Sequence, residues 1–227
     1  TEQTKTYYQK TLDALIAIQI DGNEGFDYSK CYDFNRFDTN VILHDLYYFK
    51  NYFLDLLDIH YSKKNLLEEF NQLSQKLVAL PLQKFMFRDF QARNVMIFDQ
   101  KAYLIDYQGG MKGPVQYDLV SLLWQAKANL TNSEKREYYN YYLQHLQQKL
   151  NVDIEPKSFE VGYHLCLIIR TLQVLGAYGF RGLFEKKPHF IESISFGLKN
   201  LEQLQKMSVF EPYPTLSLLI SELVTPQ

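Results

Sequence analysis

The sequence is poor in the residues and patterns that mark several protein classes. Its 2 cysteines, Cys31 and Cys166, lack the CxxC spacing of a metal or redox site, so a disulfide framework is excluded and a reducing compartment is favoured. The charge is nearly balanced, with a formal net charge of −2, and no overall positive field attracts nucleic acid or anionic lipid. The apolar runs stop well short of the roughly 20 residues that span a bilayer, and the amino-terminal segment has no signal-peptide core. We therefore expect a cytoplasmic protein with no nucleic-acid or membrane partner.

Motifs of several enzyme classes are missing as well. The 5 histidines show neither HExxH nor another paired-ligand spacing, which gives no support to a histidine metal site. The glycines form neither GxGxxG nor GxxxxGK[ST], and no VAIK-like lysine in a strand-rich stretch precedes residue 84. Ser121 and Ser195 lack the GxSxG elbow of a hydrolase.

What the chain does have is a helical spacing of apolar residues over most of its length. At 46% hydrophobic it has ample material for a packed core. A Tyr-rich helix is predicted over 134–150, with Asn132 or Ser133 as its N-cap, and a buried helix between Gly162 and Val174. Apolar positions three and four residues apart predict further helices: Leu12, Leu15 and Ile16; Ile42, Leu46, Phe49, Phe53, Leu56 and Leu57; Leu66, Phe70, Leu73, Leu77 and Leu80; Leu119, Leu122, Leu123, Ala126 and Leu130; and Ile191, Ile194, Leu198 and Leu201.

A small β region interrupts the helices between residues 84 and 106. The apolar runs KFMF, VMIF and KAYLI are short, and Asp99-Gln100 separates the last two in the manner of a tight hairpin. So few strands cannot form a core of their own and must rest on the helices. The predicted fold class is therefore α+β, mostly helical, with a small β-hairpin.

The stretch FRDFQARN, from Phe87 to Asn94, carries the most specific chemical signal. Asp89 and Asn94 have the spacing of the kinase catalytic loop H-R-D-x-x-x-x-N, with Phe87 where the histidine stands. Phosphoryl transfer needs a carboxylate to accept the proton of the attacking hydroxyl, and an uncharged oxygen nearby to hold a metal on the phosphates. Gln91 and Arg93 lie in the same loop, either solvated or in contact with phosphate or sugar.

The predicted hairpin brings a third polar residue to this loop. Its second strand returns the chain beside its starting point, so Asp106 should lie close to Asn94. A charged oxygen ligand at that place would complete a Mg²⁺ site for the β- and γ-phosphates. The alternative is purely structural: Asp89 and Asn94 would cap turns, and Asp106 would form an Asx turn.

The segments MFRDFQARNVMIF and YLIDYQGGMKGPVQYDLVSLL resemble the aminoglycoside phosphotransferase and choline kinase-like family. Within it they are most similar to the bacterial kinases that phosphorylate the anomeric hydroxyl of N-acetylmuramic acid and N-acetylglucosamine. The resemblance implies a protein-kinase-like fold, ATP as co-substrate, Mg²⁺ as cofactor, and a sugar or amino sugar as the small-molecule acceptor. It does not separate these acceptors from aminoglycosides, choline or homoserine.

The resemblance also implies roles for individual residues. Asp89 matches the catalytic base, and Asn94 and Asp106 match the Mg²⁺ ligands that hold the nucleotide. Asp118 resembles a buried aspartate that braces the catalytic loop, although a carboxylate in the first turn of a helix is also favourable there without that role. Phe87 departs from the family histidine, which affects the bracing of the loop more than the chemistry.

Members of this family have a nucleotide-binding lobe ahead of the position that corresponds to Thr1. We therefore expect residues 1–227 to be a single domain, the C-terminal catalytic and substrate lobe, with the N-terminal lobe absent and the fragment inactive alone. Two alternatives stay open. One is a pseudokinase or scaffold that binds a protein partner, and the other is an adaptor module of a larger protein.

Overall fold

The structure is a computed structural model and describes residues 1–125 and 128–225. It is mostly helical with two small antiparallel sheets, so the prediction of a mainly helical α+β fold is confirmed. The chain divides into two compact units, one made of Thr1–Phe37 and Leu80–Tyr163, the other of Asp38–Ala79 and the chain from His164 onward. That residues 1–227 form a single domain stays a prediction.

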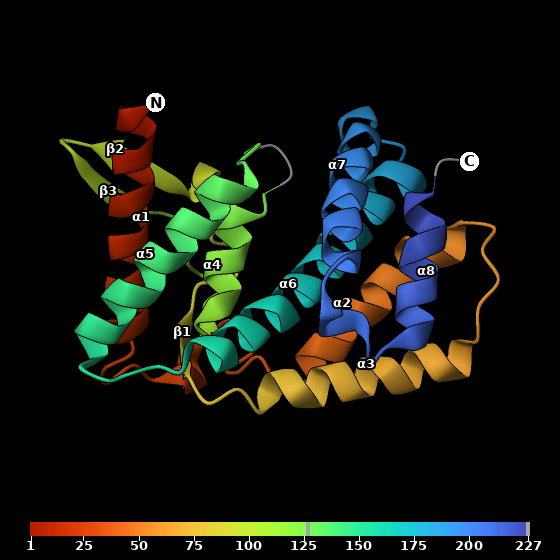
Figure 1. Ribbon diagram of the computed structural model, residues 1–227, viewed down its shortest axis with the longest axis horizontal. Helices are drawn as coiled ribbons and strands as arrows, with labels where there is room; N and C mark the ends of the chain where they lie inside the picture. The colour runs from red at the N-terminus through yellow and green to blue at the C-terminus, as the bar shows by residue number, and fades with distance from the viewer. Residues whose placement is uncertain (126–127, 226–227) are drawn as a thin grey trace. The chain divides into compact units, whose positions relative to one another are not determined.

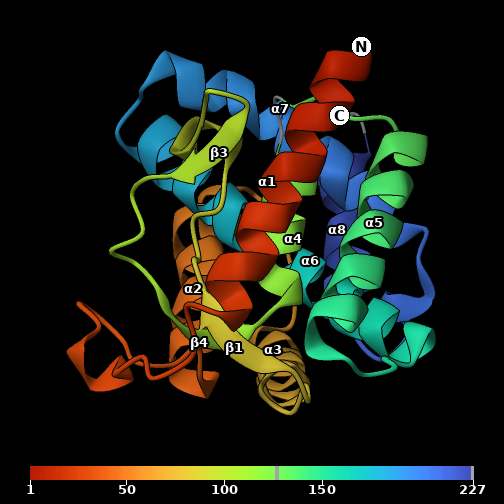
Figure 2. The same cartoon turned by 90° about the vertical axis from the view of Figure 1, so that its left-hand side faces the viewer.

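The first unit combines both sheets with helices from distant parts of the sequence. Helices α1 and α5 lie side by side (Figures 1 and 2), and α1 also contacts β1 and β3. Buried leucines such as Leu12 and Leu15 of α1 contribute to the core. The elements of this unit are α1 (Glu2–Ile20), η1 (Tyr28–Lys30), β1 (Gln83–Met86), η3 (Ala92–Asn94), β2 (Val95–Phe98), β3 (Lys101–Leu104), β4 (Met111–Pro114), α4 (Gln116–Leu123), α5 (Asn132–Leu150) and the first residues of α6 (Pro156–Tyr178).

Strands β2 and β3 form the predicted antiparallel hairpin. Val95 pairs with Leu104 and Phe98 with Lys101. Both turn residues, Asp99 with φ 45° and Gln100 with φ 58°, have left-handed backbone, as the tight turn of a two-residue hairpin requires. The hairpin therefore begins and ends next to residue 94, at the end of the loop that carries Asp89.

Strand β1 pairs with β4, which the sequence did not predict. Gln83 is opposite Pro114, and Met86 is opposite Met111. The residues of β4, Met-Lys-Gly-Pro, have no alternation and no β-branched side chain, so nothing in the sequence indicates a strand. This pairing fixes the start of the loop that follows β1.

Several helix boundaries differ from the prediction. Helix α2 (Thr39–Tyr52) ends before the predicted positions Phe53, Leu56 and Leu57, and α3 (Lys63–Val78) ends before Leu80. Helix α4 ends at Leu123, so the predicted helix through Leu130 is too long; Ala126 lies outside the described residues. Helix α5 begins at Asn132, two residues before the predicted start at 134, because Thr131 is the N-cap and forms a reciprocal capping box with Glu134. A threonine three residues before a glutamate satisfies two backbone N–H groups at once, which favours it over Asn132 or Ser133.

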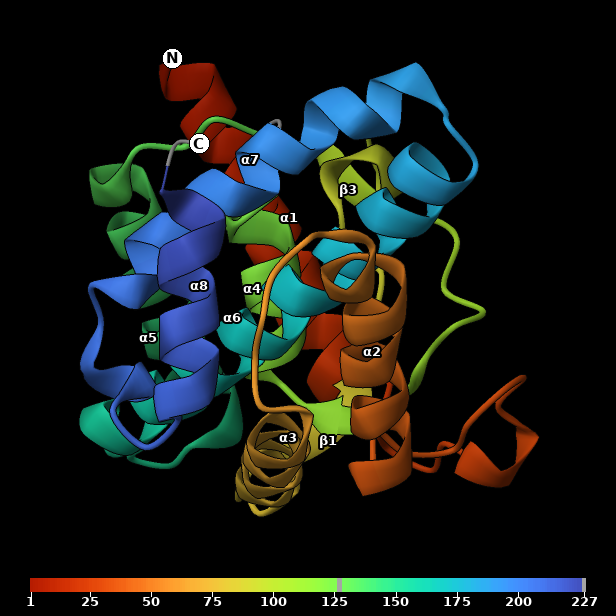
Figure 3. The ribbon, with the colours of Figure 1, turned by 90° about the vertical axis from the view of Figure 1, so that its right-hand side faces the viewer.

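The second unit is wholly helical among the residues described. Helix α7 lies beside α8, and α3 contacts both α2 and α8 (Figure 3). Its elements are α2 (Thr39–Tyr52), η2 (Leu54–Leu56), α3 (Lys63–Val78), the remainder of α6, the π-helical segment η4 (Gly179–Phe184), α7 (Pro188–Gln205), η5 (Ser208–Phe210) and α8 (Pro214–Val224).

One helix of the described residues, Pro156–Phe184, is long and apolar enough to cross a membrane by length and composition alone. From the sequence we expected the apolar runs to be too short for this, because polar residues interrupt them. Within the helix, 67% of the most apolar window is buried, as in the core helix of a globular protein. That the protein has no membrane partner stays a prediction.

A buried carboxylate on α3 holds the start of α8. Glu69 accepts hydrogen bonds from the backbone N–H groups of Thr215 and Leu216, each at 2.8 Å. These are among the first N–H groups of the helix, which have no partner inside it, and a negative charge there also favours the helix dipole. Glu69 therefore joins two helices that are far apart in the sequence.

We expect Glu69→Ala to lower the free energy of unfolding by about 2 kcal/mol, because both N–H groups lose a charged acceptor in a largely buried place. Glu68→Ala is the matched control. Glu68 is exposed and lies 3.9 Å from Lys64, a surface pair worth at most about 0.5 kcal/mol. Denaturant unfolding measures both variants, and equal losses would contradict this account of the α3–α8 contact.

Candidate active site

Two buried aromatic rings anchor the loop after β1. Phe87 and Phe90 are both fully buried, and their rings meet edge to face with centroids 5.4 Å apart. Asp89 lies between them in the sequence, with its side chain 38% exposed. The aromatic anchors therefore hold the loop while its carboxylate remains accessible, and Phe87 occupies the histidine position of the motif as a packing residue.

The residue before Asp89 has an unfavourable backbone conformation. Arg88 has φ 72°, which costs about 1–2 kcal/mol for a residue with a side chain. The fully buried carboxylate of Asp118 compensates for this strain, since it accepts hydrogen bonds from the backbone N–H of Phe87 at 2.7 Å and of Arg88 at 2.9 Å. Asp118 also lies in the first turn of α4, where its charge is favourable to the helix. It therefore combines the two arrangements expected from the sequence, a carboxylate at a helix start and a contact to the loop.

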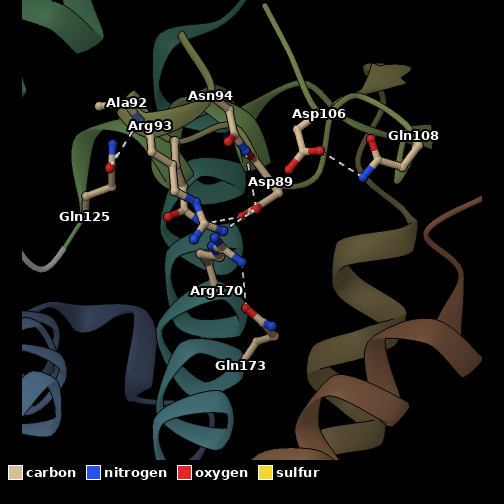
Figure 4. Close-up of polar contacts among 10 residues, drawn as sticks. Asp89, Ala92, Arg93, Asn94, Asp106, Gln108, Gln125, Arg170 and Gln173 are labelled. Carbon is tan, nitrogen blue, oxygen red and sulfur yellow. Dashed lines mark hydrogen bonds and ion pairs between the residues drawn. The ribbon is translucent and has the colours of Figure 1, made fainter. Parts of the chain in front are cut away.

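The Asp89 carboxylate is surrounded by side-chain donors (Figure 4). Arg93 Nη2 donates to Oδ2 at 2.9 Å, and Gln91 Nε2 donates to Oδ1. Asn94 Nδ2 lies 3.4 Å from Oδ2. Gln91 and Arg93 therefore both contact the candidate base, and these contacts orient its two oxygens.

Asn94 is buried, and its amide group has a fixed orientation. Its Nδ2 donates to the main-chain carbonyl of Asp89 at 2.9 Å. This direction leaves Oδ1 as the atom that is available to a cation, because no described residue donates a hydrogen bond to it. The 4% exposure of Asn94 means that this oxygen is held by the fold.

The hairpin returns Asp106 to the same place. The N–H of Ile105 donates to the carbonyl of Asn94 at 3.0 Å, so the next residue, Asp106, starts beside Asn94. Asp106 has φ 70°, is exposed, and accepts a hydrogen bond from Gln108 Nε2 at 3.1 Å. In Figure 4 the side chains of Asp89, Asn94 and Asp106 all lie at the base of the hairpin. The structure therefore brings the three predicted residues together.

This set of oxygen atoms is suited to Mg²⁺. Among residues 1–125 and 128–225, no three His, Cys, Asp or Glu side chains form a group that could hold a metal ion, so a metal here would depend on the amide oxygen of Asn94 as well. Mg²⁺ prefers oxygen ligands, keeps several waters, and is usually bound by one or two carboxylates together with substrate phosphates. Asp106 and the Oδ1 atom of Asn94 meet this description.

Sequence reasoning missed three residues that support the loop. Gln125 Oε1 accepts the N–H of Ala92 at 3.2 Å. Gln19 on α1 donates a hydrogen bond to Asp118, and Tyr142 on α5 donates one to Gln19. No local pattern marks these residues, since they reach the loop through the tertiary fold.

Comparison with solved structures shows that the fold is shared with choline kinase-like proteins. A choline/ethanolamine kinase family protein from Mesorhizobium loti superposes with a TM-score of 0.56 at 12% identity and covers 96% of this chain. Choline kinase LicA from Streptococcus pneumoniae superposes with a TM-score of 0.51 at 16% identity and covers 88%. This chain spans 65% of the length of each of these two chains.

At the level of sequence, no curated protein matches the chain significantly. The model of the phosphotransferase enzyme family matches residues 31–151. The matched region contains the loop with Asp89, the hairpin, Asp106 and Asp118. The chain belongs to the phosphotransferase enzyme family.

Proposed function

We propose that the protein transfers the γ-phosphoryl group of ATP to a hydroxyl group of a small molecule, with Asp89 as the catalytic base and Asn94 and Asp106 as ligands of Mg²⁺. The observation that carries the proposal is the joint geometry of these residues. The side-chain Nδ2 of Asn94 donates to the main-chain carbonyl of Asp89. The main-chain carbonyl of Asn94 accepts the N–H of Ile105, the residue before Asp106. A base and two metal ligands are therefore held by one short loop and one hairpin.

The residues divide the work of phosphoryl transfer, in which positioning and electrostatics supply most of the rate. Asp89 orients the acceptor hydroxyl and takes its proton. One of its present donors must make room for that hydroxyl, and Arg93 is suited to leave because its side chain is 68% exposed and exposed ion pairs are weak. When bound, Mg²⁺ neutralises charge on the nucleotide phosphates; Asn94 and Asp106 supply its protein oxygens.

For the acceptor we propose a sugar or amino sugar. The support is the resemblance of MFRDFQARN and GPVQYDLVSLL to the motifs of the anomeric amino-sugar kinases. The solved structures of similar fold carry the names of choline and ethanolamine kinases, which makes those alcohols the competing acceptors. We further propose that the reaction takes place in the cytoplasm, because it would use ATP and because Cys31 and Cys166 form no disulfide among the described residues.

The first test is Asp89→Asn in the natural protein. We expect turnover to fall by roughly 100-fold or more, because the proton acceptor is lost, while the fold and nucleotide affinity are kept. The matched control is Asp99→Asn. Asp99 is an exposed aspartate at the far end of the hairpin with left-handed backbone, a conformation that asparagine tolerates. Steady-state kinetics that show equal rates for wild type and Asp89→Asn would remove Asp89 from the chemistry.

The second test separates metal binding from base catalysis. Asp106→Ala should abolish the Mg²⁺-dependent part of ATP binding, since it removes the charged ligand of the metal. Calorimetric titration with ATP, with and without Mg²⁺, measures that part for wild type, Asp106→Ala and Asp89→Asn. Mg²⁺-dependent binding that survives in Asp106→Ala would contradict the assignment. If Asp89→Asn and Asp106→Ala are both silent, a scaffold that binds a protein partner replaces the kinase.

A further inference from the structure

A buried chain of hydrogen bonds runs from the Asp89 loop to the helices α1 and α5. Gln19 Nε2 on α1 donates to Asp118 Oδ2 at 3.2 Å and to the carbonyl of Val115 at 3.1 Å. The hydroxyl of Tyr142 on α5 donates to Gln19 Oε1. Gln19, Asp118 and Tyr142 are all fully buried. Their helices, α1, α4 and α5, lie within the first unit (Figure 2).

The direction of the Gln19 amide determines whether this chain supports Asp118. An amide can present either its NH₂ group or its oxygen to a neighbour. The NH₂ group stabilises a buried carboxylate, whereas the oxygen would repel it. The Tyr142 hydroxyl, which also lies 3.4 Å from the Val115 carbonyl, donates to Oε1, and that carbonyl accepts from Nε2. Both contacts favour the orientation in which NH₂ faces Asp118. Burial and the charge of Asp118 raise the pKa of Tyr142 well above its ordinary range, so the hydroxyl keeps its proton and remains a donor.

Asp118 in turn determines the backbone at the candidate base. Its two oxygens accept the N–H groups of Phe87 and Arg88, and Arg88 is in the strained left-handed region. A carboxylate that loses one donor, or faces a repelling oxygen, moves or attracts a proton and holds these N–H groups less firmly. The loop would then relax, and Asp89 would leave its position.

We propose that Gln19 and Tyr142 are positioning residues for the phosphotransfer reaction: they act through Asp118 to hold the loop in the conformation that presents Asp89. This proposal rests on the proposed function, since it assigns a purpose to the geometry of Asp89. Both residues are fully buried and offer no surface to a substrate. Their effect should therefore be on turnover and on the backbone of residues 87 and 88, and not on the affinity for ATP.

The test compares two single-atom changes on the same helix. Tyr142→Phe removes the hydroxyl that orients Gln19. Tyr139→Phe is the matched control, because Tyr139 is also a buried tyrosine of α5 and its hydroxyl has no hydrogen-bond partner among the described residues. Hydrogen exchange of the amides of Phe87 and Arg88 should become about tenfold faster in Tyr142→Phe, as for loss of one buried hydrogen bond, and stay unchanged in Tyr139→Phe. The kcat of the natural protein should fall by a similar factor, with the KM for ATP unchanged.

A second variant, Gln19→Met, removes the donor to Asp118 with little change in volume, and it should reproduce both effects of Tyr142→Phe. Unchanged amide exchange at residues 87 and 88 in folded Tyr142→Phe or Gln19→Met overturns the proposal, even if Asp89→Asn abolishes activity. Faster exchange with unchanged kcat overturns it too, because the network would then be structural only. If amide exchange is faster in the two variants but the wild-type protein phosphorylates nothing, the proposed function fails and the contact between the network and the loop remains.

Discussion

The arrangement of the site depends on the contact between the Asp118 carboxylate and two backbone N–H groups of the loop after β1. Phe87 and Arg88 donate to it at 2.7 and 2.9 Å, and Arg88 has a backbone conformation that a residue with a side chain adopts only under constraint. Without this acceptor the strain would be released and the buried N–H groups would lack a partner. The same contact fixes the direction in which the chain enters Asp89.

From that point the hairpin and Asn94 complete the site by short local links. The side-chain NH₂ group of Asn94 donates a hydrogen bond to the main-chain carbonyl of Asp89, and the main-chain carbonyl of Asn94 accepts one from the N–H of Ile105. The first link is made by the Asn94 side chain and the second by the main chain, so the geometry of the site depends both on the hairpin and on the asparagine at position 94. This explains how a region of so few strands, resting on helices, can present a set of groups suited to phosphoryl transfer.

Much of this region could be predicted from the sequence because its signals are local. The apolar run VMIF, the turn at Asp99-Gln100 and the run KAYL became β2 and β3 as expected, and the DxxxxN spacing identified Asp89 and Asn94. The prediction that the chain belongs to a phosphotransferase family is confirmed by the family model, which matches residues 31–151. The roles of the individual site residues stay predictions.

What the sequence did not reveal arises from contacts between distant residues. Strand β4 contains glycine and proline and exists because β1 pairs with it. Thr131 caps α5 through a capping box with Glu134, in which each side chain accepts a hydrogen bond from the backbone N–H of the other residue. Gln19 lies 99 residues from Asp118 and 123 residues from Tyr142. No periodicity or spacing encodes such a network, since each residue alone has the character of an ordinary position on an amphipathic helix.

The central claim is that this fold transfers a phosphoryl group to a small-molecule hydroxyl. The most direct measurement is phosphorus NMR of the natural protein incubated with ATP and Mg²⁺ and, in turn, N-acetylglucosamine, N-acetylmuramic acid, choline and an aminoglycoside. We predict a new phosphate-ester signal with one of the amino sugars, formed together with ADP. Absence of a phosphorylated product from all of these acceptors, with a folded protein, would contradict the claim.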